Sequence, residues 1–436
     1  MRSRRKKSRV LIGGMIVFLL LSLFFIVSNG NVGNGRGYTG ALPRIEVSLK
    51  GVSLDEIKAG GKDIKYDNNI VFIRSDEAGE LFLNVEIKGR GNSTWLPEKK
   101  PYRLKFGNKV SIFGDGPSKK WVLLAGFYDD AAVRNDLAFY VANLLGENYS
   151  GGGEFVELIV DGTNEGLYYV TQAIDGNMVR IRDEYGIMME MDNLYCENEE
   201  KYYKSRNGTC FTVKDVVVDE NEDVAVTAFM MDFEKLEEAA REGNYEMVKE
   251  LADEKSLAKY YLMSEFSNNP DAYVTSWYFY KNGIRDEIHV GPMWDYDFAF
   301  GNKNWEFEEY FYNPDVLLTR KMEAFGLMGE NGEILVEENT EISKLMFYLM
   351  EMPEFREVVR RIYGETLAER KDEIMNYIDF VTGRIRSEAL KDAEKWGKGD
   401  FDEGVRYLKW WVERRFEKMD EVFGGKIMIE MPEFEV

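Results

Sequence analysis

Histidine and cysteine are nearly absent from this chain of 436 residues, which contains one His and two Cys. Thiolate and imidazole are the main zinc ligands in proteins, so the composition nearly excludes a zinc site built from them. A Ser-His-Asp triad would have to use His289, and no Gly-x-Ser-x-Gly nucleophile elbow is present. The two cysteines, Cys196 and Cys210, could form a disulfide in an oxidising compartment or remain thiols.

Positive charge is also scarce, with 56 Lys and Arg against 78 Asp and Glu. Six of the basic residues lie within residues 1–9, so removing that segment changes the net charge from −22 to −28 for the remainder. A body this acidic repels phosphate backbones, which argues against a nucleic-acid-binding protein.

The basic residues 1–9 precede an uncharged apolar run over residues 10–27. As a helix these 18 residues would span about 27 Å, close to the hydrocarbon thickness of a bilayer. The basic flank predicts a cytoplasmic tail, a single-pass membrane anchor and an extracytoplasmic remainder. The alternative is a cleaved signal sequence. Residues 28–41, rich in Gly and Asn, are predicted to form a flexible linker.

The remaining residues, 42–436, predict an α+β fold with two lobes. Residues 42–190 favour a β-rich lobe, because Leu81, Leu83, Val85 and Ile87 alternate with polar residues. Residues 191–436 favour a mixed and then helical lobe. The individual elements expected are strands over 101–106, 120–125 and 186–191, hairpins over 154–172 and 278–290, and helices over 129–145, 233–242, 245–253, 256–267 and most of 341–423.

A glycine-containing segment, Lys88–Trp95, lies between two predicted strands. Glycines let a backbone approach a ligand closely, and hydroxyl, amide and basic side chains suit phosphate oxygens. A strand, Gly loop and strand is the arrangement by which protein kinases cover ATP phosphates. The alternative is a tight β-hairpin with solvated basic residues. The candidate nucleotide-binding residues are Gly89, Arg90, Gly91, Asn92, Ser93, Lys100, Arg103 and Lys105.

Three aspartates are candidates for catalysis and metal binding. Asp295 and Asp297 are expected to point the same way from an extended segment among aromatic residues. Paired carboxylates in such a setting suit Mg²⁺ or Mn²⁺ that also holds phosphates. Asp271 precedes Asp295 by 24 residues, and kinases place a catalytic carboxylate shortly before the metal-binding one. The alternative is that these aspartates cap turns.

In this order the motifs resemble the spore coat protein H (CotH) kinase family. The resemblance rests on Lys88–Trp95, Lys99–Lys105, Trp121–Ala125, Asp130 with Val133–Asn135, Gly166–Tyr168, Asp271 and Gly291–Asp297 with Gly301. It implies an atypical kinase-like two-lobe fold that uses ATP and Mg²⁺ or Mn²⁺ to phosphorylate Ser or Thr of surface or secreted proteins. It also implies Asp271 as a catalytic carboxylate and Asp295 or Asp297 as the metal ligand. The oligomeric state is left open.

Two positions depart from the expected pattern. Gln172 stands where the family usually carries Glu, and Ser276 stands where kinases carry a metal-binding Asn. Both are compatible with lost catalysis, which would make the chain a non-catalytic surface adhesion or interaction module. A third alternative is a glycoside-acting enzyme with paired carboxylates, near aromatic residues such as Trp294 and Trp305.

Overall fold

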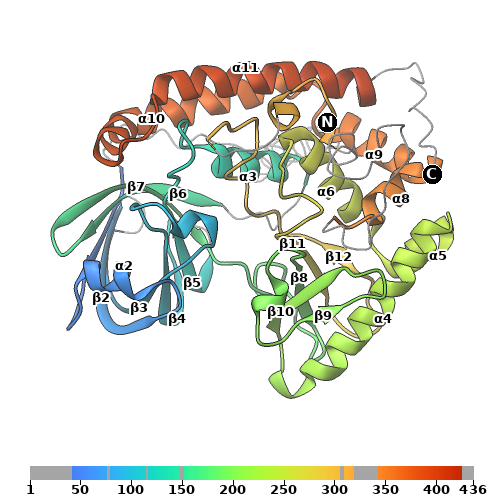
Figure 1. Ribbon diagram of the computed structural model, residues 1–436, viewed down its shortest axis with the longest axis horizontal. Helices are drawn as coiled ribbons and strands as arrows, with labels where there is room; N and C mark the ends of the chain where they lie inside the picture. The colour runs from blue at the N-terminus through green and yellow to red at the C-terminus, as the bar shows by residue number, and fades with distance from the viewer. Residues whose placement is uncertain are drawn as a thin grey trace, which may run out of the picture. The chain divides into compact units, whose positions relative to one another are not determined.

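The computed structural model describes residues 42–75, 79–113, 116–146, 152–304, 309–318 and 342–424. Its first half forms a closed β-barrel with the strand order β1-β2-β3-β4-β5-β7-β6 (Figure 1). The strands are β1 (Arg44–Ser48), β2 (Lys65–Ser75), β3 (Gly79–Gly89), β4 (Tyr102–Ser111), β5 (Pro117–Leu124), β6 (Gly153–Val160) and β7 (Thr163–Gln172). A parallel pairing of β1 with β6 closes the barrel, which leaves no edge strand unpaired.

The barrel interior follows from the alternation of apolar residues along its strands. Val85 and Ile87 of β3, Leu104 of β4 and Trp121 of β5 are all buried in one cluster. The other face of β5 and β7 is apolar as well, and there Val122 packs into the larger core of the second half. The strand expected over residues 81–87 is therefore present, and the barrel is packed on two sides.

Asp161 and Gly162 form the turn between β6 and β7, with φ of +47° and +81°, as the Asp-Gly dipeptide predicts. Helix α3 (Arg134–Leu144) begins later than the expected residue 129. The Asp129 carboxylate accepts hydrogen bonds from the backbone N of Ala131 and Arg134, at 3.1 and 2.8 Å. Asp129 therefore shapes the turn before the helix.

The second half contains a five-stranded sheet of order β12-β11-β8-β10-β9. Its strands are β8 (Ile187–Met191), β9 (Tyr203–Lys204), β10 (Cys210–Val216), β11 (Trp277–Lys281) and β12 (His289–Val290). The barrel ends at Gln172 and β8 pairs with β10 and β11, so the lobe boundary expected near residue 190 falls inside the second sheet. The hairpin expected over residues 278–290 is confirmed, because β11 and β12 pair antiparallel. Within its loop, Asn282 N donates a hydrogen bond to the Asp286 carboxylate.

Helices make up most of the remaining described chain. They are α2 (Leu54–Gly60), α4 (Glu222–Arg241), α5 (Tyr245–Leu251), α6 (Glu254–Ser267), α8 (Leu345–Glu351), α9 (Pro353–Thr366), α10 (Lys371–Trp396) and α11 (Phe401–Met419). Helix α4 starts eleven residues before the expected Phe233, and α2 and β10 were not expected. The helical character expected over residues 341–423 is confirmed within the part described.

Cys196 and Cys210 form a disulfide, with Cα atoms 6.3 Å apart. The expected cytoplasmic tail, anchor and linker occupy residues 1–41, which lie outside the described residues. Among the helices that are described, none is both long and apolar enough to cross a membrane.

Candidate active site

The loop that carries Asp271 begins where α6 ends. Asn268 closes the helix in the left-handed region, with φ of +50°. The side chain of Asn269 then makes two contacts: its Oδ1 accepts from Asp271 N at 3.3 Å, and its Nδ2 donates to Asp295 O at 3.0 Å. One amide therefore ties the Asp271 loop to the segment that carries Asp295.

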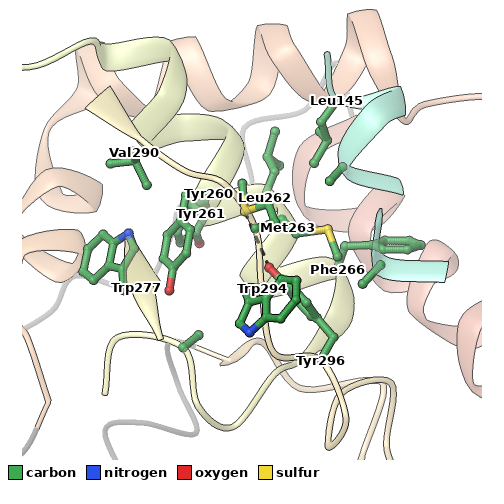
Figure 2. Close-up of a cluster of buried hydrophobic side chains, with 14 of the residues drawn as sticks. Leu145, Tyr260, Tyr261, Leu262, Met263, Phe266, Trp277, Val290, Trp294 and Tyr296 are labelled. Atoms are coloured by element: carbon green, nitrogen blue, oxygen red, sulfur yellow. Dashed lines mark hydrogen bonds between the residues drawn. The ribbon is translucent and has the colours of Figure 1, made fainter. Parts of the chain in front are cut away.

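The segment Gly291–Gly301 directs some of its side chains into the hydrophobic core and others toward the candidate site. Figure 2 shows Trp294 and Tyr296 packed among apolar side chains of α6, such as Met263 and Phe266. Contrary to expectation, the two aspartates of this segment do not lie on an extended strand, because Asp295 adopts a positive φ of +67°. A positive φ is uncommon outside glycine and is often found at functional sites.

The three predicted aspartates lie close enough for their charges to affect pKa values within the group. Burial raises the pKa of Asp271 well above its ordinary value, and the neighbouring Asp295 and Asp297 raise it further. Burial and Asp295 raise the pKa of Asp297 to about 7, while Asn135 and Arg90 act in the opposite direction. Clustered carboxylates that resist ionisation are typical of sites that hold cations or transfer protons.

A fourth carboxylate, Asp192, belongs to this group and was not predicted. It contributes to the raised pKa of Asp271, and its Oδ1 accepts a hydrogen bond from Thr275 Oγ1 at 2.9 Å. Next to it, Asn193 N donates to Val274 O at 2.9 Å. The sequence feature that could have predicted Asp192 is its position, as a charged residue directly after the buried strand β8. This end of the sheet faces the Asp271 loop.

The Gly loop is ordered by its own contacts. A Cβ on Gly89 would lie 2.5 Å from the Trp95 ring, and Gly91 has a φ of +86°, so both positions require glycine. Arg90 N donates to Pro101 O at 3.2 Å, and the Arg90 guanidinium lies 5.7 Å from the Trp294 ring centroid. The loop thereby brings a cation next to the Asp295–Asp297 segment.

The remaining predicted loop residues have other surroundings. The Asn92 side chain accepts from Lys62 Nζ, and Ser93 begins a short 3₁₀ helix, η1 (Ser93–Trp95). Lys100 Nζ donates to Trp95 O at 2.6 Å and to Leu96 O at 3.3 Å. Lys100 therefore contacts the backbone of the loop, and the phosphate contact expected of it stays a prediction.

The predicted basic residues of β4 lie on the outer face of the barrel. Lys105 is exposed and pairs in register with Lys120. Arg103 Nη2 donates to Glu86 at 3.2 Å, whereas its Nε is buried without a partner among the described residues. Lys88, which was not predicted, lies opposite Arg103 in the sheet, and burial lowers the pKa of Lys88. An unpaired guanidinium donor beside a second cation suits an anionic group.

Asp295 and Asp297 can hold a divalent cation if water and substrate phosphates supply the remaining metal ligands. Within the described ranges, no group of three or more His, Cys, Asp or Glu side chains is arranged to bind a metal ion. Mg²⁺ usually binds one or two carboxylates together with water and substrate phosphates, so two carboxylates are sufficient. Ser276 Oγ, which stands in the kinase Asn position, lies 3.3 Å from Asp295 Oδ2.

A cavity of about 450 Å³ lies beside the segment that follows β7. Gly176 N donates to Asp215 Oδ2 at 2.7 Å on its wall. The cavity is lined by Lys109, Gly176, Asn177, Ile181, Arg182, Gly186, Asp215, Val216 and Val217.

Gln172 stands at the position where the family usually carries Glu. Its side-chain Nε2 donates a hydrogen bond to Gly116 O at 3.1 Å.

The family model for the CotH kinase protein matches residues 86–419. A search of solved structures found the proinflammatory kinase CtkA of Helicobacter pylori, with 9% sequence identity and a TM-score of 0.20. That match covers 80% of this chain and 92% of the other. No curated protein matched.

Proposed function

Because the chain belongs to the CotH kinase family, we propose that it is an ATP-dependent kinase that phosphorylates Ser or Thr residues of proteins. The observation that carries the proposal is the position of Arg90, on the Gly loop, next to the segment of Asp295 and Asp297. Phosphoryl transfer needs cations on the phosphates and carboxylates that hold metal and orient the nucleophile. Both kinds of group converge here.

In the proposed reaction the acceptor hydroxyl oxygen forms a bond to the γ-phosphorus as the bond to the β,γ-bridging oxygen breaks. ADP leaves, and Asp271 takes the hydroxyl proton. Asp295 and Asp297 would hold Mg²⁺ or Mn²⁺, which neutralises charge on the phosphate oxygens. Arg90, together with the cationic pair Arg103 and Lys88 on β4 and β3, would bind the phosphates.

The raised pKa of Asp271 has a consequence for this role. Its own neighbours are carboxylates, which disfavour the ionised form that a general base requires. Cationic ligands at Asp295 and Asp297 would reduce that repulsion and favour ionised Asp271. Asp271 would then accept a proton only when cations are bound at Asp295 and Asp297, so the site would not act as a base without its ligands.

We also propose that the kinase acts outside the cytoplasm on surface or secreted proteins. This part of the proposal rests on the basic residues 1–9 and the apolar run over residues 10–27. The Cys196–Cys210 disulfide supports it, since disulfides persist in oxidising compartments. Protease protection of residues 42–436 in intact cells would contradict this location.

A non-catalytic binding module is the second candidate. It is favoured by Ser276 at the kinase Asn position and by Gln172, whose side chain contacts a backbone oxygen. A module of this kind would bind Mg-ATP or a protein partner and transfer nothing. The third sequence-based alternative, a glycoside-acting enzyme, assigns no role to the Gly loop or to Arg103.

The test is transfer of radiolabel from [γ-³²P]ATP to the purified full chain and to Ser-rich and Thr-rich acceptor proteins, with Mg²⁺ and with Mn²⁺. We expect transfer by the wild type and its loss in Asp271→Asn and Asp295→Asn. Asp315→Asn, which alters an exposed Arg414 pair, is the matched control and should remain active. Binding of Mg-ATP by the wild type without transfer under either metal would favour the binding module.

A further inference from the structure

One buried aspartate in the C-terminal helices contacts barrel residues that precede it by more than 200 positions in the sequence. Asp392 of α10 is 2% exposed. Its Oδ1 accepts from Leu167 N of β7 at 3.0 Å and lies 2.7 Å from Lys99 Nζ. Figure 1 shows α10 running past β7 beside α11. The C-terminal part of α10 therefore packs against β7 of the barrel.

The barrel is shaped to receive this carboxylate. Gly166 has a φ of +98°, and a Cβ there would lie 2.2 Å from Asp392 Oδ1. Lys99 is fully buried, and its ammonium lies 4.8 Å from the Tyr168 ring centroid. A buried ion pair of this kind fixes geometry more than it adds stability, because the desolvation of both charges offsets their attraction.

Lys99 connects Asp392 to the Gly loop. It lies between the loop and β4, two residues before Pro101, whose carbonyl accepts the hydrogen bond from Arg90 N. A displacement of Lys99 would therefore move the backbone that presents Arg90. Asp392 is linked to the Gly loop through these contacts.

A second set of contacts leads from Asp392 to the aspartates. Lys398 Nζ lies 3.4 Å from Asp392 Oδ2 and donates to Gly126 O at 2.7 Å. Gly399 N donates to Asp130 Oδ1 at 3.1 Å, and a Cβ on Gly399 would clash with that carboxylate. The segment containing Gly126 and Asp130 is thus held against the residues that follow α10.

The same segment contacts the Asp297 region directly. Arg134 pairs with Asp129 and donates from Nε to Ala299 O at 3.0 Å. Asn135 Oδ1 accepts from Tyr296 N at 2.9 Å. A small cavity, of about 20 Å³, is lined by both Asp297 and Asp392. The two carboxylates therefore border the same small cavity.

We infer that Asp392 is a positioning residue that holds the Gly loop and the Asp295–Asp297 segment in one fixed arrangement, through Lys99 on one side and Lys398 on the other. Its contacts are with Lys99, Leu167 N and Lys398. The inference explains why Lys99, Asp130, Asn135 and Gly166, which carry no chemistry of their own, accompany the catalytic motifs. It rests on the proposed function for its effect on rate, but its effect on geometry is independent of that function.

The geometric test uses spin labels on two exposed residues in different halves, Phe82→Cys in β3 and Met231→Cys in α4. The distance distribution between the labels is measured by double electron–electron resonance in the full chain, without reductant, so that Cys196 and Cys210 stay paired. We expect a narrow distribution in the parent and a broadened one after Asp392→Asn. Glu388→Gln, which alters an exposed ion pair of the same helix, should leave the distribution narrow.

The kinetic arm separates positioning from simple destabilisation. We expect Asp392→Asn to lower kcat/KM roughly 10- to 100-fold at a temperature where the variant is folded, because small misplacements of reacting groups cost that much. Lys398→Met should act in the same direction and decides the question if Asp392→Asn does not fold. A narrow distance distribution in the folded variant would overturn the inference, and so would broadening with unchanged kcat/KM. If the wild type transfers no phosphoryl group, the proposed function fails and the distance measurement still tests the inference.

Discussion

Asn269 donates a hydrogen bond from its side-chain Nδ2 to the backbone oxygen of Asp295, at 3.0 Å. The two residues are separated by 26 positions in sequence, and each adjoins a different part of the candidate site. The bond joins the loop of the proposed base, Asp271, to the segment of the proposed metal ligands. The mutual position of these groups therefore depends on an amide that performs no chemistry.

Replacing Asn269 with Ala should lower phosphoryl transfer much more than stability. Each of the two hydrogen bonds of the Asn269 side chain contributes about 1 kcal/mol to the unfolding free energy, whereas misplaced catalytic groups cost roughly 10- to 100-fold in kcat. Both quantities are measured on the same preparation, by denaturant unfolding and by initial rates. Asn221→Ala removes a comparable bond, from Nδ2 to Glu184 O at 3.1 Å, and should leave kcat unchanged. Equal effects of the two substitutions on kcat would contradict the role assigned to Asn269.

Asp297→Asn should abolish transfer but stabilise the fold at neutral pH. Burial and Asp295 raise the pKa of Asp297 to about 7, so ionising it in the folded state is unfavourable. Removing that charge should raise the free energy of unfolding by about 1–4 kcal/mol, since each pKa unit corresponds to about 1.4 kcal/mol. Thermal and urea unfolding at pH 8 measure the difference. A marked loss of stability would mean that the carboxylate is needed for the fold.

The unfolding free energy should also depend on Asp136, which is buried outside the site. Burial raises the pKa of Asp136 to about 6, although Tyr377 donates a hydrogen bond to it at 2.8 Å. The folded state therefore binds more protons than the unfolded state between about pH 4 and pH 6, so this group lowers stability as pH rises through that window. Compared with Asp136→Asn, the wild type should lose about 2 kcal/mol of unfolding free energy between pH 4 and pH 6.5. A difference that does not vary with pH would contradict this assignment.

Reduction of the Cys196–Cys210 disulfide should weaken the loop that carries Asp192. Cys210 N donates to Asn193 Oδ1 at 2.8 Å, and Asn193 N donates to Val274 O, so the bridge lies two contacts from the Asp271 loop. Removing a cross-link of this length costs about 3 kcal/mol in the loop-entropy view. Hydrogen exchange with and without reductant should show faster exchange at residues 192–196 and 271–275, with the barrel unchanged. Uniform faster exchange would indicate global destabilisation only.

The sequence predicted features that depend on local pattern. Alternating apolar residues predicted β3, Asp-Gly predicted the turn between β6 and β7, and the helical character expected over residues 341–423 includes α10 and α11. The pairing of β1 with β6 that closes the barrel joins residues more than 100 positions apart, and no local pattern encodes it. The group of Asp271, Asp295 and Asp297 was predicted from the spacing and order of motifs.

The supporting residues were harder to predict, because their roles depend on long-range contacts. Lys100 and Arg103 both resemble phosphate-binding residues in sequence, yet one braces the loop backbone and only the other keeps an unpaired donor. Asp192 directly follows β8 and Asp392 belongs to α10. A charged residue after a buried strand was the local signal for Asp192, and Asp392 has no local signal of its own. Their functions follow from contacts that only the folded chain creates.

The most direct test of the central claim is mass spectrometry of acceptor proteins incubated with Mg-ATP and the purified full chain. The account predicts new phosphoserine or phosphothreonine with the wild type and none with Asp271→Asn. The control Asp315→Asn should match the wild type. Unmodified acceptors and an unmodified chain, under conditions in which Mg-ATP binds, would contradict phosphoryl transfer as the function of this site.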